Sequence, residues 1–402
     1  EYPNPPIKTG YPQMLFEQVT AGLGYHPFPQ PSANLSRPYV NPLGIAMGEC
    51  TYCGFCERFG CANYSKASAQ TTILPVLMQR PNFEARTECE VLKVNLTADG
   101  KRAKSVTYID AKGVEYEQPG ELVLICAYSL MNVRMMLLSG IGTQYDPATG
   151  KGTVGRNYCY QTSCGARLFL EGKHLNPFIG SGSMGRTIDD FNGDAFDHSH
   201  LDFVGGAGMS CDPSNGRPIG YRPTPPGTPR WGAGWKKGTV EGYQNAMNIG
   251  AQGSSYPVRE NYLDLDPTYT DRHGRPLLRI TFEFPDNDVA MSNYMSDQLE
   301  KIAKAFGPKS YSVSRIRKDW NSVPYQSTHN TGGAIMGENP RTSAVNKYLQ
   351  SWDVPNVFVI GASAFAHNAG MNPTGTVGAL AVWAARAITG KYLKHPGALV
   401  HA

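Results

Sequence analysis

The residue best suited to acid–base chemistry in this 402-residue chain is His329, near the C-terminal end. An imidazole can take up a proton close to neutral pH, which makes it a candidate general base. Gly332 and Gly333 follow it closely and permit tight approach of the backbone to a partner. Asn330, directly after the histidine, can contact a second oxygen of a substrate.

A second polar site precedes the last long apolar segment. Residues Val377 to Ile388 carry apolar and small side chains at three- and four-residue steps, which predicts a helix with a buried face. Asn372 is a good helix cap, and Pro373 suits the first turn. The unpaired N–H groups there would suit an anion or an electron-rich ring edge, such as the N1–C2=O edge of a flavin.

Four thiols lie within twelve residues: Cys50, Cys53, Cys56 and Cys61. The first three stand at two-residue spacings, which is typical of iron–sulfur ligation, whereas structural zinc usually takes two separated pairs. An iron–sulfur cluster is therefore favoured over disulfides and over zinc. Cys126 is expected to be a buried small hydrophobe in an apolar strand.

Three motifs in the last third, at 329–337, 356–365 and 372–376, resemble the glucose–methanol–choline (GMC) oxidoreductases. That resemblance implies His329 as the catalytic base and Asn372 as its partner beside a flavin adenine dinucleotide (FAD). It also implies a set of flavin contacts: Val91 near the adenine, Gly361 and Ala362 near the phosphoribityl chain, and Asn372, Pro373 and Thr374 near the ring.

The cysteine segment, followed by Tyr64-Ser-Lys66-Ala-Ser68, resembles the flavoprotein subunits of bacterial membrane-bound sugar and sugar-acid dehydrogenases, the gluconate 2-dehydrogenase type in particular. This implies a three-iron (3Fe-4S) cluster in preference to a four-iron one. It further implies a cytochrome c partner subunit and a small subunit that guides export. The expected location is the periplasm, with membrane attachment only through those partners.

The expected fold is mixed α/β and α+β, with a discontinuous FAD-binding domain and a sheet-based substrate domain. A hairpin over 85–109, a buried strand at 121–126 and a helix at 131–138 match the flavin domain of the family. The predicted parts are a connecting segment with the cysteines (1–75), flavin domain (76–150), substrate domain (151–325) and flavin domain with the active site (326–402).

Composition limits the alternatives. A net charge of +4, dispersed along the chain, gives no reason to expect nucleic-acid binding. No Gly-x-Gly-x-x-Gly stands between a strand and a helix, although the family carries this dinucleotide fingerprint near its N-terminus. The expectation is that a front segment is missing.

The predicted reaction is oxidation of a hydroxyl of a sugar, polyol or sugar acid by proton abstraction and hydride transfer to the flavin. Two alternatives remain. One is an oxygen-using alcohol oxidase of the same family with structural cysteines, and the other is a non-catalytic electron-transfer subunit that carries the cysteine motif.

Overall fold

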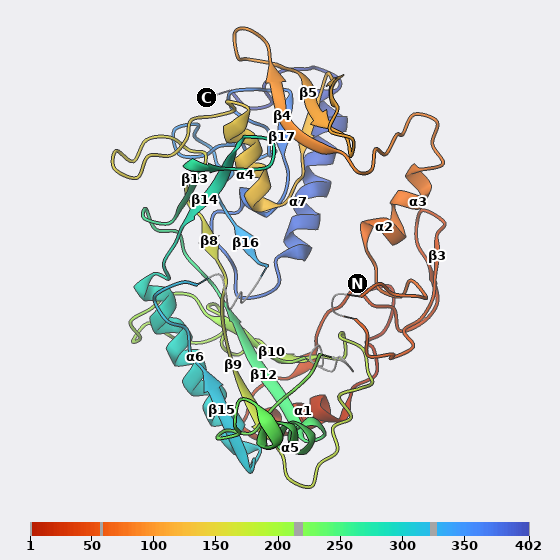
Figure 1. The fold of residues 1–402 in the computed structure, drawn as a ribbon, viewed down its shortest axis with the longest axis vertical. Coiled ribbons are helices and arrows are strands. Elements are labelled where there is room, and N and C mark those ends of the chain that lie inside the picture. The colour runs from red at the N-terminus through yellow and green to blue at the C-terminus, as the bar shows by residue number, and fades with distance from the viewer. Residues whose placement is uncertain (1, 57–58, 213–219, 322–327, 402) are drawn as a thin grey trace. The chain divides into compact units, whose positions relative to one another are not determined.

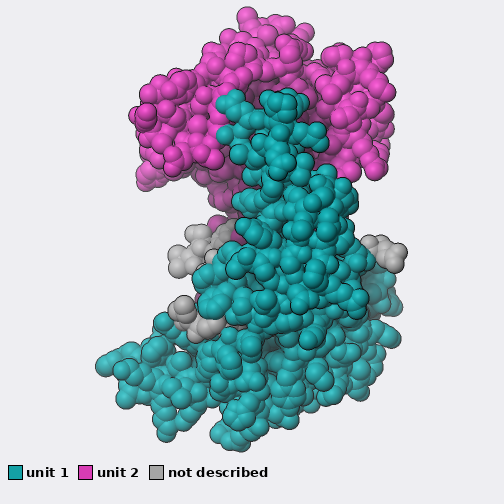
Figure 2. Space-filling model, turned by 90° about the vertical axis from the view of Figure 1, so that its right-hand side faces the viewer, with its two compact units in different colours: residues 1–85, 163–252, 290–316 teal, residues 86–162, 253–289, 317–402 magenta. Residues whose placement is uncertain are grey.

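The structure is a computed structural model that describes residues 2–56, 59–212, 220–321 and 328–401. It divides into two compact units, each built from three stretches of chain (Figures 1 and 2). Unit 1 comprises Glu1–Ala85, Ser163–Gln252 and Ala290–Ile316, and unit 2 comprises Arg86–Thr162, Gly253–Val289 and Arg317–Ala402.

Unit 1 is built on a six-stranded sheet with the order β1-β10-β11-β12-β9-β15. The strands are β1 (Phe28–Pro29), β9 (Thr162–Phe169), β10 (Arg186–Ile188), β11 (Ala207–Cys211), β12 (Ala246–Gly253) and β15 (Ser310–Ser314). Smaller elements of this unit are α1 (Tyr11–Gly22), β2 (Tyr39–Val40), β3 (Ala46–Met47), α2 (Ala69–Thr72), α3 (Leu74–Leu77) and α5 (Gly232–Tyr243). Burial alternates along β9 and β12, as expected where one face of a sheet meets a core.

The long helix α6 (Asp286–Ala305) packs on this sheet, and its Met291, Met295 and Leu299 share one apolar core with sheet residues. The four-residue spacing of these side chains places them along one stripe of the helix. Phe16 of α1 belongs to the same core. The N-terminal residues, which have no sustained sequence period, thus contribute a helix and the strand β1 to unit 1.

The described part of unit 2 contains the antiparallel sheet β4-β5-β6, three two-stranded ladders (β7-β17, β8-β16 and β13-β14) and several helices. Its elements are β4 (Glu90–Leu96), β5 (Ala103–Ile109), β6 (Glu115–Pro119), β7 (Val123–Ile125), α4 (Ser129–Leu138), β8 (Cys159–Tyr160), β13 (Tyr262–Thr270), β14 (Pro276–Thr281), β16 (Asn330–Thr331), β17 (Val357–Val359), the 3-10 turn η2 (Ala362–Ala364), α7 (Thr374–Ala387) and the π-helical turn η3 (Ile388–Tyr392). The hairpin, the strand and the helix expected over 85–138 all form.

The strands β7 and β17 pair in parallel although 234 positions separate Val123 from Val357. Both are short apolar runs, as parallel strands usually are. Phe358 of β17 packs with Ile388 and Tyr392 from the end of the last helix. This contact sets α7 beside the strand that leads to η2.

The boundaries of the two compact units differ from the predicted domain boundaries. Residues 253–289, predicted within the substrate domain, group with unit 2, and residues 1–75 group with the six-stranded sheet. The contact of the β13–β14 hairpin with α4 accounts for the first of these differences. Within the described residues, no helix is both long enough and apolar enough to cross a membrane.

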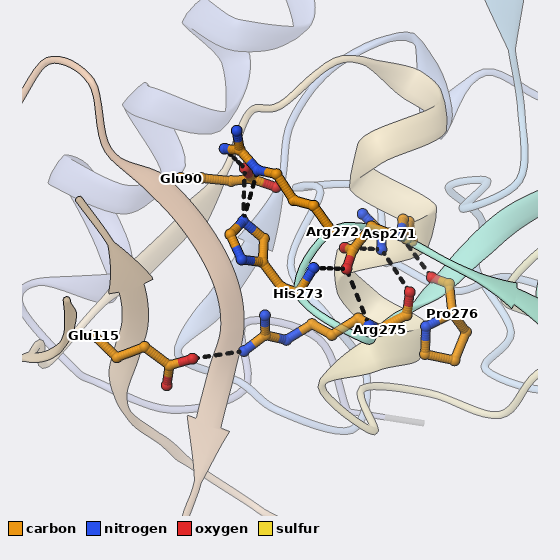
Figure 3. A network of polar contacts seen from close by, with 8 residues as sticks. Glu90, Glu115, Asp271, Arg272, His273, Arg275 and Pro276 are labelled. Carbon is orange, nitrogen blue, oxygen red and sulfur yellow. Dashed lines mark hydrogen bonds and ion pairs between the residues drawn. The ribbon is translucent and has the colours of Figure 1, made fainter. Parts of the chain in front are cut away.

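A polar network ties several elements of unit 2 together (Figure 3). Arg134 of α4 pairs with Asp271 at the β13–β14 turn (2.6 Å), and each side chain is 13% exposed. Oε2 of Glu90 on β4 forms an ion pair with Nη2 of Arg272 (2.7 Å) and lies 3.4 Å from Nε2 of His273. The Asp271 carboxylate also accepts hydrogen bonds from the N–H groups of His273 (2.8 Å) and Arg275 (3.0 Å), which shape the turn.

Candidate active site

His329 directly precedes the short strand β16, which pairs antiparallel with β8. The register sets Asn330 opposite Tyr160 and Thr331 opposite Cys159. Continued by one residue, it sets His329 opposite Gln161, whose N–H points to the His329 carbonyl (3.4 Å). Cross-strand neighbours present their side chains on the same face, so the ladder brings these two side chains together.

Gln161 connects the two polar sites. Its Oε1 lies 2.5 Å from Nδ1 of His329. Its Nε2 donates to the carbonyls of Ala369 (3.0 Å) and Met371 (2.9 Å). Because Met371 directly precedes Asn372, one buried side chain holds both the imidazole and the turn that carries Asn372.

A second amide fixes the histidine from its backbone. Nδ2 of Asn368 donates to the His329 carbonyl (2.7 Å), and the Asn368 backbone exchanges two hydrogen bonds with Ser255. Asn368 is fully buried. The His329 ring is itself half-buried, and this burial lowers its pKa below the ordinary value of 6.5. The neutral form that a base needs is therefore favoured.

The glycines after the histidine permit a close backbone approach. A Cβ on Gly332, whose φ is +77°, would lie 1.9 Å from the carbonyl oxygen of Asn157. The Gly332 N–H donates to the carbonyl of Ala362 (3.0 Å), which belongs to η2. The predicted ribityl-phosphate contacts Gly361 and Ala362 are thus next to the His329 loop.

Asn330 is buried among hydroxyl groups. Its Oδ1 accepts a hydrogen bond from Tyr158 (2.5 Å), and its Nδ2 donates to Tyr128. The Tyr128 hydroxyl in turn donates to the carbonyl of Thr328 (2.9 Å). These contacts hold the residues on either side of His329 in place. The substrate contact expected of Asn330 stays a prediction.

The helix α7 begins at Thr374, with Pro373 as the capping residue and no side-chain cap. Asn372 therefore precedes the cap instead of serving as it, and its side chain is exposed. Thr374, Gly375 and Thr376 in the first turn are exposed as well. The N–H groups of this turn are open to a ring edge or an anion.

Several apolar side chains of unit 2 are exposed. On the face of α7 predicted to be buried, Ala384 and Ile388 are buried but Ala385 is exposed, so this face is only partly formed. Val91, the predicted adenine neighbour, is 46% exposed on β4. Cys126, expected within a strand, follows the end of β7 and is exposed.

The four clustered thiols line one cavity in unit 1. Cys50, Cys53, Cys56 and Cys61 surround a space of about 260 Å³ together with Asn34 and Lys66. The Tyr52 N–H points to Sγ of Cys50 (3.4 Å). Lys66 Nζ donates to the carbonyls of Cys56 and Phe59 (both 2.7 Å) and so closes the loop.

All nine cysteines are free thiols in the structure. Among the described residues, no three or more His, Cys, Asp or Glu side chains are grouped closely enough to hold a metal ion. The cysteine loop therefore has the donor chemistry of a cluster site and a shared cavity, without converged ligands. Residues 57–58 of this motif lie outside the described part of the chain.

Sequence reasoning did not find Gln161, Asn368 or Tyr128. The first two occur in segments without a catalytic motif, and only the β8–β16 ladder and the turn before α7 bring them to His329. Tyr128 has φ +77°, a conformation unusual for a non-glycine residue, and that strain is visible only in the fold.

Comparisons of sequence and of structure find similar proteins. Two sequence models of the GMC oxidoreductase family match the chain, one over residues 40–163 and one over 257–381. The gluconate 2-dehydrogenase flavoprotein of Pantoea cypripedii is 49% identical over 405 residues, covering 100% of this chain and 66% of that protein. The fructose dehydrogenase large subunit of Gluconobacter japonicus is 23% identical and covers 96% of this chain and 67% of that protein.

The chain thus spans about two thirds of the length of these curated relatives. The fold is similar to that of pyridoxine 4-oxidase from Mesorbium loti, with a TM-score of 0.53, 16% identity, and coverage of 82% of this chain and 62% of that one. The two family matches include the cysteine loop, the His329 loop and the start of α7. The chain belongs to the GMC oxidoreductase family.

Proposed function

We propose that this chain forms part of an FAD-dependent dehydrogenase that oxidises a hydroxyl group of a sugar, a polyol or a sugar acid. The observation that carries the proposal is the Gln161 bridge, which joins a half-buried, neutral imidazole to the turn before an exposed helix N-terminus. Removing a hydroxyl proton needs such a base, held rigidly.

The residues of unit 2 fit a flavin. The first turn of α7 offers open N–H donors, the backbone at Gly361 is in a glycine-only conformation (φ +142°), and Val91 offers an exposed apolar contact. When bound, the flavin accepts the hydride that leaves the carbon bearing the hydroxyl. Asn372, Pro373 and Thr374 would hold its ring, and Gly361 with Ala362 its ribityl chain.

In the proposed reaction, His329 takes the hydroxyl proton. Asn372, exposed at the turn before α7, hydrogen-bonds the substrate oxygen. Burial of the histidine keeps it unprotonated at neutral pH. The substrate class follows from the relatives whose names specify gluconate and fructose. A gluconate-like sugar acid is favoured, because the relative with that name is 49% identical.

The cysteine loop supports a further part of the proposal. Four thiols around one cavity can hold an iron–sulfur cluster, 3Fe-4S in preference to 4Fe-4S, if the loop closes on the iron. Such a cluster passes electrons singly, which calls for a redox partner. We propose a cytochrome c subunit, a small export-guiding subunit and a periplasmic location, with the membrane reached only through these partners.

An oxygen-using oxidase with structural cysteines is the second candidate, and it is favoured by the four thiols of the described loop, which do not converge on one metal position. Metal analysis and a low-temperature spin-resonance spectrum of the purified enzyme distinguish the two. Iron with a cluster signal supports the dehydrogenase, and flavin without iron supports the oxidase.

The test of the catalytic proposal is His329→Gln in the flavin-containing enzyme with gluconate as substrate. Loss of the base should lower kcat by about 100- to 10,000-fold while the flavin absorption spectrum stays unchanged. The same change at His395, an exposed histidine beyond η3, is the control and should leave kcat intact. Wild-type turnover by His329→Gln would remove this residue from the mechanism.

A further inference from the structure

We propose that Gln161 is a positioning residue that fixes the proton of neutral His329 on Nδ1, so that Nε2 is the atom that accepts the substrate proton. The inference rests on the proposed function. Gln161 lies 168 positions before His329 and reaches it only through the β8–β16 ladder.

The orientation of the Gln161 amide follows from its partners. Its NH₂ group faces two backbone carbonyls, those of Ala369 and Met371, at 3.0 and 2.9 Å. A carbonyl oxygen can only accept, so both hydrogens of the amide are committed there. The reverse orientation would set Oε1 against two acceptors and leave two carbonyls without a donor, at a cost of about 1–3 kcal/mol for each unsatisfied group.

The tautomer of the histidine follows in turn. With its NH₂ group committed, Gln161 presents only Oε1 to Nδ1 of His329, at 2.5 Å. An oxygen acceptor requires a hydrogen on that nitrogen. In neutral imidazole the other nitrogen, Nε2, then carries the lone pair. The fully buried side chain of Gln161 has no exposure to bulk water that could replace this contact.

Ionisable groups approach this loop from several segments. The hydroxyls of Tyr128 and Tyr158 hydrogen-bond Asn330, Tyr160 and Cys159 form β8, His367 directly precedes Asn368, and Asp288 lies near Cys159. Burial lowers the pKa of His329. Burial and the nearby Asp288 raise the pKa of Cys159 to about 12, so this thiol stays uncharged.

The test compares two Gln161 variants with a matched control. Gln161→Met keeps the length but removes donor and acceptor, whereas Gln161→Glu keeps an acceptor for Nδ1–H and adds a negative charge. Gln350 is the control, because it too is buried and donates to two carbonyls, those of Pro355 and Gly397. Its Oε1 accepts from Asn346 and from the Leu399 N–H in place of a histidine. Gln350→Met should report the general cost of losing such a side chain.

The readout independent of turnover is the ¹⁵N NMR spectrum of enzyme labelled with ¹⁵N-histidine. The His329 signals are identified by their absence in His329→Gln. Wild type, Gln350→Met and Gln161→Glu should show the hydrogen on Nδ1, and Gln161→Met should show a mixture of tautomers. In parallel, kcat of Gln161→Met should fall about 10- to 100-fold, as is usual when a residue that orients a histidine is lost.

The acid limb of the pH–rate profile adds a second measurement. A carboxylate beside Nδ1–H favours the protonated ring, so Gln161→Glu should move this limb to higher pH by about one unit. The proposal is overturned if Gln161→Met keeps the wild-type tautomer and rate, or, should that variant not fold, if Gln161→Glu leaves the limb where it is. Full turnover by His329→Gln would instead refute the proposed function, while the spectrum would still decide the tautomer.

Discussion

At the scale of single residues, the pH dependence of the reaction follows from where His329 lies. The ring is half-buried, and burial holds its pKa below 6.5. A protonated ring cannot act as a base, so activity should rise as pH rises through this lowered pKa. The acid limb of kcat/KM should therefore lie below pH 6.5, and a limb above that value would contradict the burial argument.

Gly332 allows a second prediction at this scale. An alanine there would bring Cβ within 1.9 Å of the Asn157 carbonyl oxygen, which belongs to the backbone and cannot move aside alone. Gly274 is the matched control, because its φ of +72° is similar but a Cβ there meets nothing within 4 Å. Gly274→Ala should cost about 1–2 kcal/mol of unfolding free energy from the strained φ.

Gly332→Ala should cost clearly more than that control, and it should also lower activity because the His329 loop is displaced from Gln161. Thermal unfolding of both variants, together with kcat, checks this. Equal destabilisation by the two changes would mean that the backbone contact at Asn157 is unimportant.

At the scale of elements, the ion pair Arg134–Asp271 joins α4 to the β13–β14 turn. Arg134→Met would leave the nearly buried carboxylate of Asp271 without its charged partner, which should cost about 1–3 kcal/mol of unfolding free energy. Arg134→Met combined with Asp271→Asn should recover part of this loss. As a control, Lys318→Met breaks an exposed pair with Asp286 and should change little.

The same pair predicts how stability depends on pH. Burial raises the pKa of Asp271, but hydrogen bonds from Arg134 and from the N–H groups of Arg275 and His273 outweigh it and lower the pKa to about 2. Because the folded pKa lies below the ordinary 3.8, the group stabilises the fold above pH 3.8, and this stabilisation is lost as pH falls towards 2. Asp271→Asn should flatten unfolding free energy against pH across that window.

At the scale of the whole molecule, the cysteine loop and the flavin elements belong to different units of the chain. If the loop holds a cluster that carries electrons out, Cys56→Ser should lose iron and the transfer of electrons to an added cytochrome. Substrate should still bleach the flavin absorbance, because the unit 2 residues are untouched. Cys89→Ser, outside the cavity, should keep its iron. If Cys56→Ser and Cys53→Ser both keep the iron content of the wild type, cluster binding by this loop is contradicted.

The sequence alone determined the local features of this protein. The apolar run of β7, the hairpin β4–β5 and the helices α4 and α7 appear at or within a few residues of their expected positions, because hydrophobic periodicity is a property of neighbouring residues. The family could likewise be identified from three short motifs, and two family models confirm it.

Only the tertiary structure decided which distant residues meet. Gln161 has no motif around it, yet antiparallel register places it opposite His329, and the turn before α7 supplies the two carbonyls that orient its amide. Residues 1–48 show no period, yet Phe16 completes the core of the six-stranded sheet. Pairings across more than a hundred positions depend on how whole elements pack, and that packing leaves no trace in the spacing of adjacent residues.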